Sequence, residues 1–280
     1  MISRRKFISL STASAAAISF AACQRQLVTP EAILPQGAKK KGLGQTVKFP
    51  GWEKKLTDLR CKWFYSWNHR IPETKPDGTE FIPMIYRYGG DPGVISETAV
   101  AAKTAGIKEL LGFNEPDKEK QGNMTLEQTL AAWPLLMETG LRLGSPGCTH
   151  PDTEWMVQFM AAAKQRSLRV DFVCVHSYGG PNPEAFVKRL EKVYQMFGLP
   201  LWITEFAVGD WNAKSVEENK HKPETVLRFM EQVLPMLDKL DFVERYAWFP
   251  AKTTSIPLYS SALFDADGNL TPLGQCYRDA

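Results

Sequence analysis

Cysteine is scarce in this chain of 280 residues, and its five copies lie far apart: Cys23, Cys61, Cys148, Cys174 and Cys276. None belongs to a C-x-x-C pair, the spacing at which proteins usually hold a structural zinc ion. We therefore expect no metal site. The last four cysteines are interpreted as buried free thiols, with a single bridge among them left open.

An excess of one charge is also lacking outside the first residues. The net charge of the whole chain is +3, and residues 1–22 supply all of it through Arg4, Arg5 and Lys6. The rest of the chain has equal numbers of acidic and basic residues. Because nucleic acid binding needs a Lys and Arg footprint on the phosphates, we expect no nucleic acid partner. Neither an anionic membrane surface nor an acidic polymer is indicated.

Glycine-rich phosphate loops are absent as well. The segment Gly42-Leu43-Gly44 lacks the third glycine and the downstream acid of a dinucleotide fingerprint, and no G-x-x-x-x-G-K-[ST] occurs. This absence disfavours nucleotide binding, and with it the open doubly wound sheet that is the main alternative fold. We expect no cofactor.

The first 22 residues have the order of an export signal. Residues 3–8 (SRRKFI) resemble a twin-arginine motif, and the Ala- and Ser-rich run that follows is too polar for a membrane span. Residues 20–23 (FAAC) resemble a lipobox in which Cys23 would carry lipid, with plain cleavage after Ala22 as the alternative. Residues 23–41 are interpreted as a tether. We expect an exported protein of the periplasm, the cell envelope or the exterior, touching a membrane only through Cys23.

From residue 42 onwards, short apolar runs alternate with amphipathic stretches, which is typical of β/α units around a parallel sheet. Strands are expected at 41–44, 61–67, 80–86, 107–113, 141–145, 170–177, 200–205 and 242–249. Helices are expected at 52–59, 92–105, 125–140, 152–168, 183–198 and 223–240. Helix starts are marked by Asp91-Pro92 and by a Thr125/Gln128 capping box. Eight strands in a body of this length predict one (β/α)8 barrel over residues 42–280, without a helix between the second and third strands.

The residues that end these apolar runs would meet at the mouth of such a barrel. Two are carboxylates, Glu115 and Glu205, and the others are aromatic, amide or imidazole side chains: Trp67, Asn68, Tyr86, Asn114, His176, Tyr178 and Trp248. Cleavage of a glycosidic bond uses two carboxyl groups, and a separation of about 5–5.5 Å between them predicts retention of the anomeric configuration. Aromatic rings stack on the C–H faces of sugars, and amides bond their hydroxyls. The combination predicts a glycoside hydrolase.

Each of these residues also has a purely structural explanation. Asn114-Glu115-Pro116 is a common turn, His176 resembles a core histidine, and Trp67 or Trp248 could cover the hydrophobic core. Glu205 is harder to explain in this way, because a carboxylate that ends a buried strand needs a partner. The joint occurrence at successive strand ends favours a functional site.

Five segments together resemble glycoside hydrolase family 128, the glycosyl hydrolase catalytic-core family related to the alkali-sensitive-linkage proteins of fungal walls. They are WFYSWN at 63–68, FIPM at 81–84, LLGFNEPD at 110–117, VHSYG at 175–179 and LWITEFA at 201–207. The resemblance covers about residues 42–279. It implies a clan A (β/α)8 barrel and endo-acting, retaining hydrolysis of β-1,3-glucan.

The resemblance implies roles for two glutamates. Glu115 would be the acid/base and Glu205 the nucleophile of a double displacement. We expect the negative charge of Glu205 to raise the pKa of Glu115, so that Glu115 can protonate the leaving sugar.

The resemblance also implies a set of positioning and sugar-binding residues. Asn114 would bond the 2-hydroxyl, Tyr178 would orient Glu205 with His176 nearby, and Trp248 would form the floor of the cleavage subsite.

Two strand ends depart from the usual family pattern and leave the linkage preference open. The second expected strand ends in Tyr65-Ser66-Trp67-Asn68, where Tyr-Asn-Trp is more usual, and the third ends in Tyr86, where Trp is more usual. One alternative is therefore a clan A hydrolase for another β-linked polysaccharide, and a second is a non-catalytic envelope glycan-binding lipoprotein. A purely structural envelope protein explains least. We expect a monomer that binds a neutral polysaccharide.

Overall fold

The computed structural model describes residues 39–280. The predicted export signal, Cys23 and most of the predicted tether lie outside the described residues. Within residues 39–280, no helix has the length and apolar character needed to cross a membrane. Of the cysteines in this part of the chain, Cys61, Cys148, Cys174 and Cys276 are all free thiols, and the first three are buried, as predicted.

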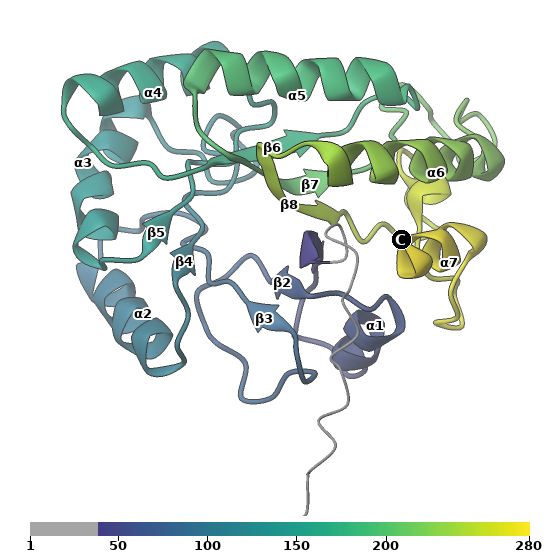
Figure 1. Ribbon diagram of the computed structural model, residues 1–280, viewed down its shortest axis with the longest axis horizontal. Helices are drawn as coiled ribbons and strands as arrows, with labels where there is room; N and C mark the ends of the chain where they lie inside the picture. The colour runs from purple at the N-terminus through teal and green to yellow at the C-terminus, as the bar shows by residue number, and fades with distance from the viewer. Residues whose placement is uncertain (1–38) are drawn as a thin grey trace, which may run out of the picture. The chain divides into compact units, whose positions relative to one another are not determined.

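Parallel strands form the centre of the described chain (Figure 1). They are β1 (Lys41–Gly44), β2 (Trp63–Tyr65), β3 (Glu80–Phe81), β4 (Glu109–Leu110), β5 (Arg142–Leu143), β6 (Val173–Ser177), β7 (Leu201–Phe206) and β8 (Val243–Trp248). Six of them pair in the order β3-β2-β1-β8-β7-β6, and β4 pairs with β5. Single parallel bridges, Met84 to Leu111 and Gly144 to Phe172, connect the two sheets on both sides. The (β/α)8-barrel-like fold predicted from the sequence is confirmed.

Helices surround the strands (Figure 1). They are α1 (Trp52–Asp58), α2 (Pro92–Thr104), α3 (Leu126–Glu138), α4 (Glu154–Gln165), α5 (Pro183–Phe197), α6 (Pro223–Lys239) and α7 (Pro272–Asp279), with a 3₁₀ turn η2 (Tyr259–Ser261). The predicted start signals act as expected, because Asp91 caps α2 and Thr125 and Gln128 form the capping box of α3. Residues 66–79, between β2 and β3, contain no helix, which was also predicted.

Two lysines that the sequence assigns to the tether belong to the folded body. Lys40 Nζ donates to three backbone carbonyls at the end of α6, at 3.0 to 3.3 Å. Lys41 Nζ donates to three carbonyls at the end of α7, at 2.6 to 2.9 Å. Carbonyls in the last turn of a helix lack partners and carry partial negative charge, so cations stabilise them. The tether therefore ends before Lys40, because this pair caps two helices.

The interior of the barrel is lined mainly by large side chains that form a cluster separate from the layer between strands and helices: Trp63, Tyr65, Ile82, Met84, Leu111, Phe172, Cys174, Trp202 and Ala247. Near the starts of the strands, charged side chains pack against this cluster and interact with one another or with its aromatic rings. Arg142 makes a bidentate pair with Glu244 at 2.7 and 2.8 Å, and Arg245 lies 4.4 Å above the Trp202 ring. Trp67 and Tyr86 pack on the cluster and lead toward the opposite, carboxyl ends of the strands.

Candidate active site

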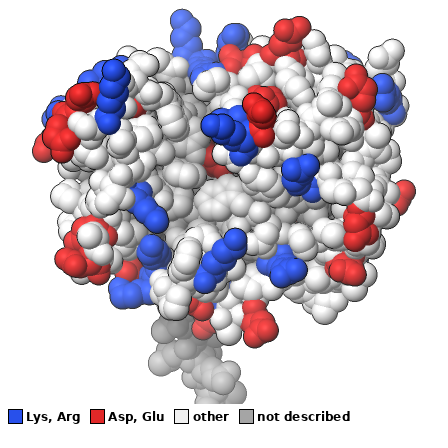
Figure 2. All heavy atoms as spheres, turned by 180° about the vertical axis from the view of Figure 1, so that it is seen from behind, with Lys and Arg blue, Asp and Glu red and all other residues white. Residues whose placement is uncertain are grey.

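A cavity of about 600 Å³ lies where the strands end. Its walls come from the segments that follow β2, β3, β4, β5, β6, β7 and β8, and consist of Trp67, Tyr86, Asn114, Glu115, Lys118, Gln121, Thr149, His150, Tyr178, Glu205, Trp211, Phe249 and Leu258. Figure 2 shows one face of the molecule, on which basic and acidic side chains are interspersed around a hollow. A surface without a field of one sign suits a neutral ligand.

Glu205 lies on β7 and is held by neutral donors. Its Oε1 accepts hydrogen bonds from Tyr65 Oη at 3.1 Å and from Trp67 Nε1 at 2.7 Å, and its Oε2 accepts one from Tyr178 Oη. Burial, followed by the charge of Glu205, raises the pKa of both tyrosines well above the ordinary value. The two phenols therefore stay protonated and fix the direction in which the carboxylate points.

Glu115 lies in a strained turn after β4. Its φ of 37° is in the left-handed region that residues other than glycine seldom adopt. Its backbone N–H donates to the Gly147 carbonyl at 2.7 Å, which ties the turn to the segment after β5. Trp67, with φ of 53°, is strained in the same way. Surrounding contacts must hold both residues in place, as is common at functional sites.

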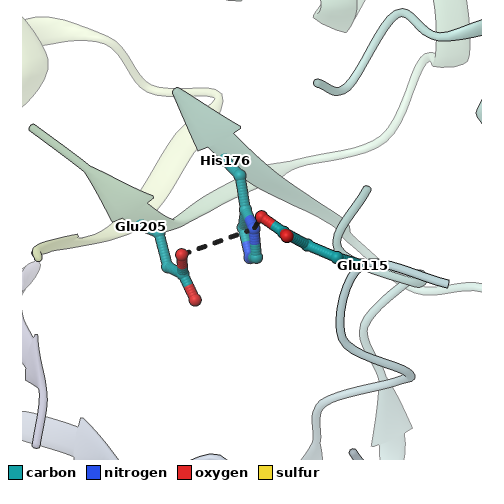
Figure 3. A group of neighbouring side chains, drawn as sticks. All are labelled: Glu115, His176 and Glu205. Atoms are coloured by element: carbon teal, nitrogen blue, oxygen red, sulfur yellow. Dashed lines mark hydrogen bonds and ion pairs between the residues drawn. The ribbon is translucent and has the colours of Figure 1, made fainter. Parts of the chain in front are cut away.

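His176 lies between the two glutamates (Figure 3). Its Nδ1 is 3.2 Å from Glu115 Oε1 and 3.5 Å from Glu205 Oε2, and the imidazole is fully buried. One ligand atom from each of the three residues lies within 4.8 Å of the others. The two carboxyl groups therefore face each other across a single imidazole.

The pKa shifts in this cluster favour a proton on the imidazole over one on Glu115. Burial lowers the pKa of His176, but the charges of Glu205 and Glu115 outweigh burial, so the net pKa lies above its ordinary value. Burial raises the pKa of Glu115, but the hydrogen bond and charge of His176, with help from Lys118, lower it further than burial raises it. The expectation of a raised Glu115 pKa was therefore wrong for the free protein. That expectation was based on the charge of Glu205 alone. The imidazole of His176 contacts Glu115 directly and has the larger effect on its pKa.

By distance alone, Glu115, His176 and Glu205 could share a metal ion. However, Glu205 already accepts hydrogen bonds from two phenols and an indole, and a metal ion would have to displace these donors. Donors of this kind stabilise a carboxylate as an anion. The arrangement is therefore better suited to acid, base and nucleophile chemistry than to metal binding.

The structure brings most of the predicted site residues together. Trp67, Tyr86, Asn114 and Tyr178 line the cavity with the two glutamates. Tyr86 donates to Gln121 Oε1 at 2.6 Å. His176 lies behind the wall and reaches the cavity only through the carboxylates.

Besides His176, two other predicted site residues do not line the cavity. Trp248 is fully buried, lies 4.8 Å from the Phe206 ring, and donates to the Ser261 carbonyl. Successive side chains of a strand point to opposite faces, and the next residue, Phe249, lines the cavity instead. Asn68 folds back on its own loop, where it bonds Ser66 and accepts from the Arg70 N–H. Trp248 therefore does not form the floor of this cavity as expected, whereas sugar binding by Asn68 stays a prediction.

Several other side chains at the site were not among the predicted residues. Tyr65 lies inside a predicted strand, and only its distance from Glu205 shows its part in the site. Lys118 Nζ is 3.3 Å from Glu115 Oε2, and its position three residues later in the same turn is a signal that was available. Trp211, 60% exposed at the rim, stands in a loop whose path the sequence does not predict.

Known proteins share both the sequence and the fold of this chain. Residues 47–277 match the family model described as the glycosyl hydrolase catalytic core. Alkali-sensitive linkage protein 1 of Schizosaccharomyces pombe is 27% identical over 238 residues, a match that covers 81% of this chain. The chain spans only 42% of the length of that relative.

Solved structures of glycoside hydrolase family 128 (GH128) are also similar. A mutant of a subgroup I endo-β-1,3-glucanase from Amycolatopsis mediterranei, in complex with laminaripentaose, has a TM-score of 0.75 and 34% identity, covering 86% of this chain and 99% of that one. A subgroup III curdlan-specific exo-β-1,3-glucanase from Blastomyces gilchristii has a TM-score of 0.69 and 29% identity, covering 88% and 100%. The chain therefore belongs to the glycosyl hydrolase catalytic core family, within glycoside hydrolase family 128, and is a glycoside hydrolase.

Proposed function

We propose that this protein is a retaining endo-β-1,3-glucanase in which Glu205 is the nucleophile and Glu115 the acid/base. The observation that carries the proposal is the approach of the two carboxylates, which share His176 and have oxygens within 4.8 Å of each other. Inverting glycosidases keep their carboxyl groups about 6.5–9.5 Å apart to admit a water molecule, whereas retaining enzymes bring them to about 5–5.5 Å. The spacing supports double displacement.

In the first step, a Glu205 oxygen attacks the anomeric carbon while Glu115 gives a proton to the departing glycosidic oxygen. The C–O bond to the leaving sugar breaks and a glycosyl ester of Glu205 forms. Glu115 obtains its proton from His176 across the 3.2 Å contact as negative charge builds up on the leaving oxygen. In the second step, Glu115 takes a proton from water and returns it to His176, while the water oxygen attacks the anomeric carbon and releases Glu205.

The choice of substrate follows from the relatives and from the wall of the cavity. The Amycolatopsis enzyme at 34% identity is an endo-β-1,3-glucanase crystallised with laminaripentaose. Here the cavity presents Trp67, Tyr86 and Phe249 as apolar faces and Asn114 as an amide beside the carboxylates. Buried Asn114 Oδ1 has no partner among the described residues, so a sugar hydroxyl can serve as its donor.

The first test replaces the nucleophile. Glu205→Gln keeps the size of the side chain but removes the attacking charge, so turnover of laminarin should fall by about 10³-fold or more. Binding of laminarihexaose, measured by calorimetry, should persist. The control Glu191→Gln, on the exposed face of α5, should match the wild type in both measurements.

The stereochemistry of the product provides a second readout of the same proposal. Proton NMR of the wild-type reaction should show the β-anomer first, before mutarotation. Near wild-type turnover by Glu205→Gln, or an α-anomer as the first product, would refute the double displacement.

A further inference from the structure

A second cavity, of about 410 Å³, adjoins the catalytic cavity. Its walls come from the loop after β1, the loop after β8 and residues 263–266, and include Gln45, Phe49, Lys55, Thr253 and Phe264. Trp67 lines both cavities and so forms the wall that they share. The size is within the range of ligand sites in proteins.

The chemistry of this second cavity resembles that of the first. Phe49 is 68% exposed, although large aromatic side chains are usually covered. Gln45 is 5% exposed, lines the cavity, and leaves its Oε1 without a hydrogen-bond partner within residues 39–280. A buried amide oxygen without a partner costs free energy unless a ligand supplies a donor. The exposed ring of Phe49 can stack on the C–H face of a sugar, and Gln45 Oε1 can accept a hydrogen bond from a sugar hydroxyl.

The shared tryptophan relates the second cavity to the catalytic pair. The Trp67 indole N–H donates to Glu205 Oε1 at 2.7 Å. The far edge of the indole packs on Gly44, where an added Cβ would lie 2.8 Å from the ring. Trp67 thus connects the second cavity to Glu205, the proposed nucleophile, which bonds to the glycone sugar. Glu115, the proposed acid, protonates the leaving sugar instead. A sugar chain that enters the second cavity would belong to the part that stays on Glu205.

We propose that the cavity lined by Gln45 and Phe49 is a distal glycone subsite that binds the non-reducing continuation of the substrate chain and sets how many units lie beyond the cleaved bond. The inference rests on the proposed glucanase function and adds its chain-length specificity. Phe49 stacks on a sugar ring and Gln45 accepts from a hydroxyl. Trp67 forms the wall between this subsite and the cleavage site.

The test compares Phe49→Ala with Val157→Ala, which shortens an exposed apolar side chain on α4 that lines neither cavity. We expect kcat/KM of the wild type to rise from laminaritriose to laminarihexaose. In Phe49→Ala the ratio of the two values should fall about tenfold, which corresponds to about 1.4 kcal/mol. In Val157→Ala the ratio should equal that of the wild type. Gln45→Leu, checked for its unfolding midpoint, should lower the ratio in the same direction.

The position of cleavage separates a subsite from a merely structural role. With laminarihexaose labelled at the reducing end, Phe49→Ala should shift the labelled products toward longer fragments, because fewer units are held on the glycone side. A wild type that is active but indifferent to chain length, or a variant with unchanged ratio and products, overturns the subsite and leaves the glucanase standing. A wild type without turnover on any of these substrates overturns both.

Discussion

A single imidazole contacts both glutamates in this site. His176 has no solvent exposure, and its Nδ1 contacts one oxygen of each carboxylate. The raised pKa of His176 and the lowered pKa of Glu115 both favour a proton on the imidazole over a proton on Glu115. Such coupled groups titrate together, so the pH profile of the enzyme reports the pair.

The pH dependence of His176→Gln tests this view. In the wild type, kcat/KM should fall at high pH when the pair loses its last proton, with an apparent pKa above the ordinary histidine value of 6.5. In the variant that proton can reside only on Glu115, a weaker base, so the alkaline limb should move to lower pH by about one unit or more. The measurement is kcat/KM on laminarin as a function of pH. The control His221→Gln should keep the alkaline limb of the wild type. An unchanged alkaline limb would show that His176 does not carry the proton.

Individual site residues were predictable where chemistry alone identifies them. Glu205 stands out because a carboxylate that ends a buried strand needs a partner, and Glu115 stands out through its occurrence together with the other strand-end residues. Trp248 was chosen by residue type, but the alternation along β8 directs it into the core and leaves Phe249 at the cavity. Tyr65 could not be found from the sequence, because its role depends on contact with a residue 140 positions away.

Among the elements, the last turns of α6 and α7 depend on residues from the other end of the folded body. Lys40 and Lys41 supply the donors for six backbone carbonyls in these turns. Lys41 is 1% exposed, and burial lowers its pKa to about 8. The amine is therefore protonated at pH 6 and can donate all three hydrogens.

Removing the Lys41 amine should destabilise the protein. Lys41→Met keeps an unbranched side chain of similar length but leaves three carbonyls without their donor, at a cost of about 2 kcal/mol in the free energy of unfolding. The midpoint of thermal unfolding at pH 6 should fall by about 4–8 °C, as followed by circular dichroism. Lys39→Met, which changes an exposed neighbour, is the matched control. Equal midpoints for the two variants would mean that the Lys41 cap contributes little.

Helices were predicted more accurately than strands because their end signals are local. Asp91 and Thr125 each cap the helix that the sequence assigns to them. Asn182 caps the start of α5, and Gly198 ends that helix with φ of 66°. Strands were predicted too long: the expected 107–113 is reduced to Glu109–Leu110 in the structure. The length of a strand depends on where its neighbours leave the ladder, and those neighbours are distant in sequence.

At the scale of the whole molecule, stability does not depend on disulfides among the described residues. Cys61, Cys148 and Cys174 are buried free thiols, and burial raises the pKa of Cys61 to about 12. A thiol in this state is unreactive, because the thiolate is the nucleophile.

The reactivity of the three buried thiols checks this property. They should remain unmodified by Ellman's reagent at pH 8 in the folded protein and react once guanidinium unfolds it, as located by peptide mass mapping. The midpoint of thermal unfolding should be the same with and without a reductant. Rapid modification of any of the three in the native protein, or a midpoint that falls with reductant, would contradict the prediction.

The lysine caps also bear on the order of events during synthesis. Strand β1 pairs with β2 on one side, but its partners on the other side, β8 and the end of α7, are made only after about two hundred further residues. The nascent barrel must therefore stay open at this seam until residues 272–280 have left the ribosome. Closure of the barrel at this seam is therefore a late step of folding.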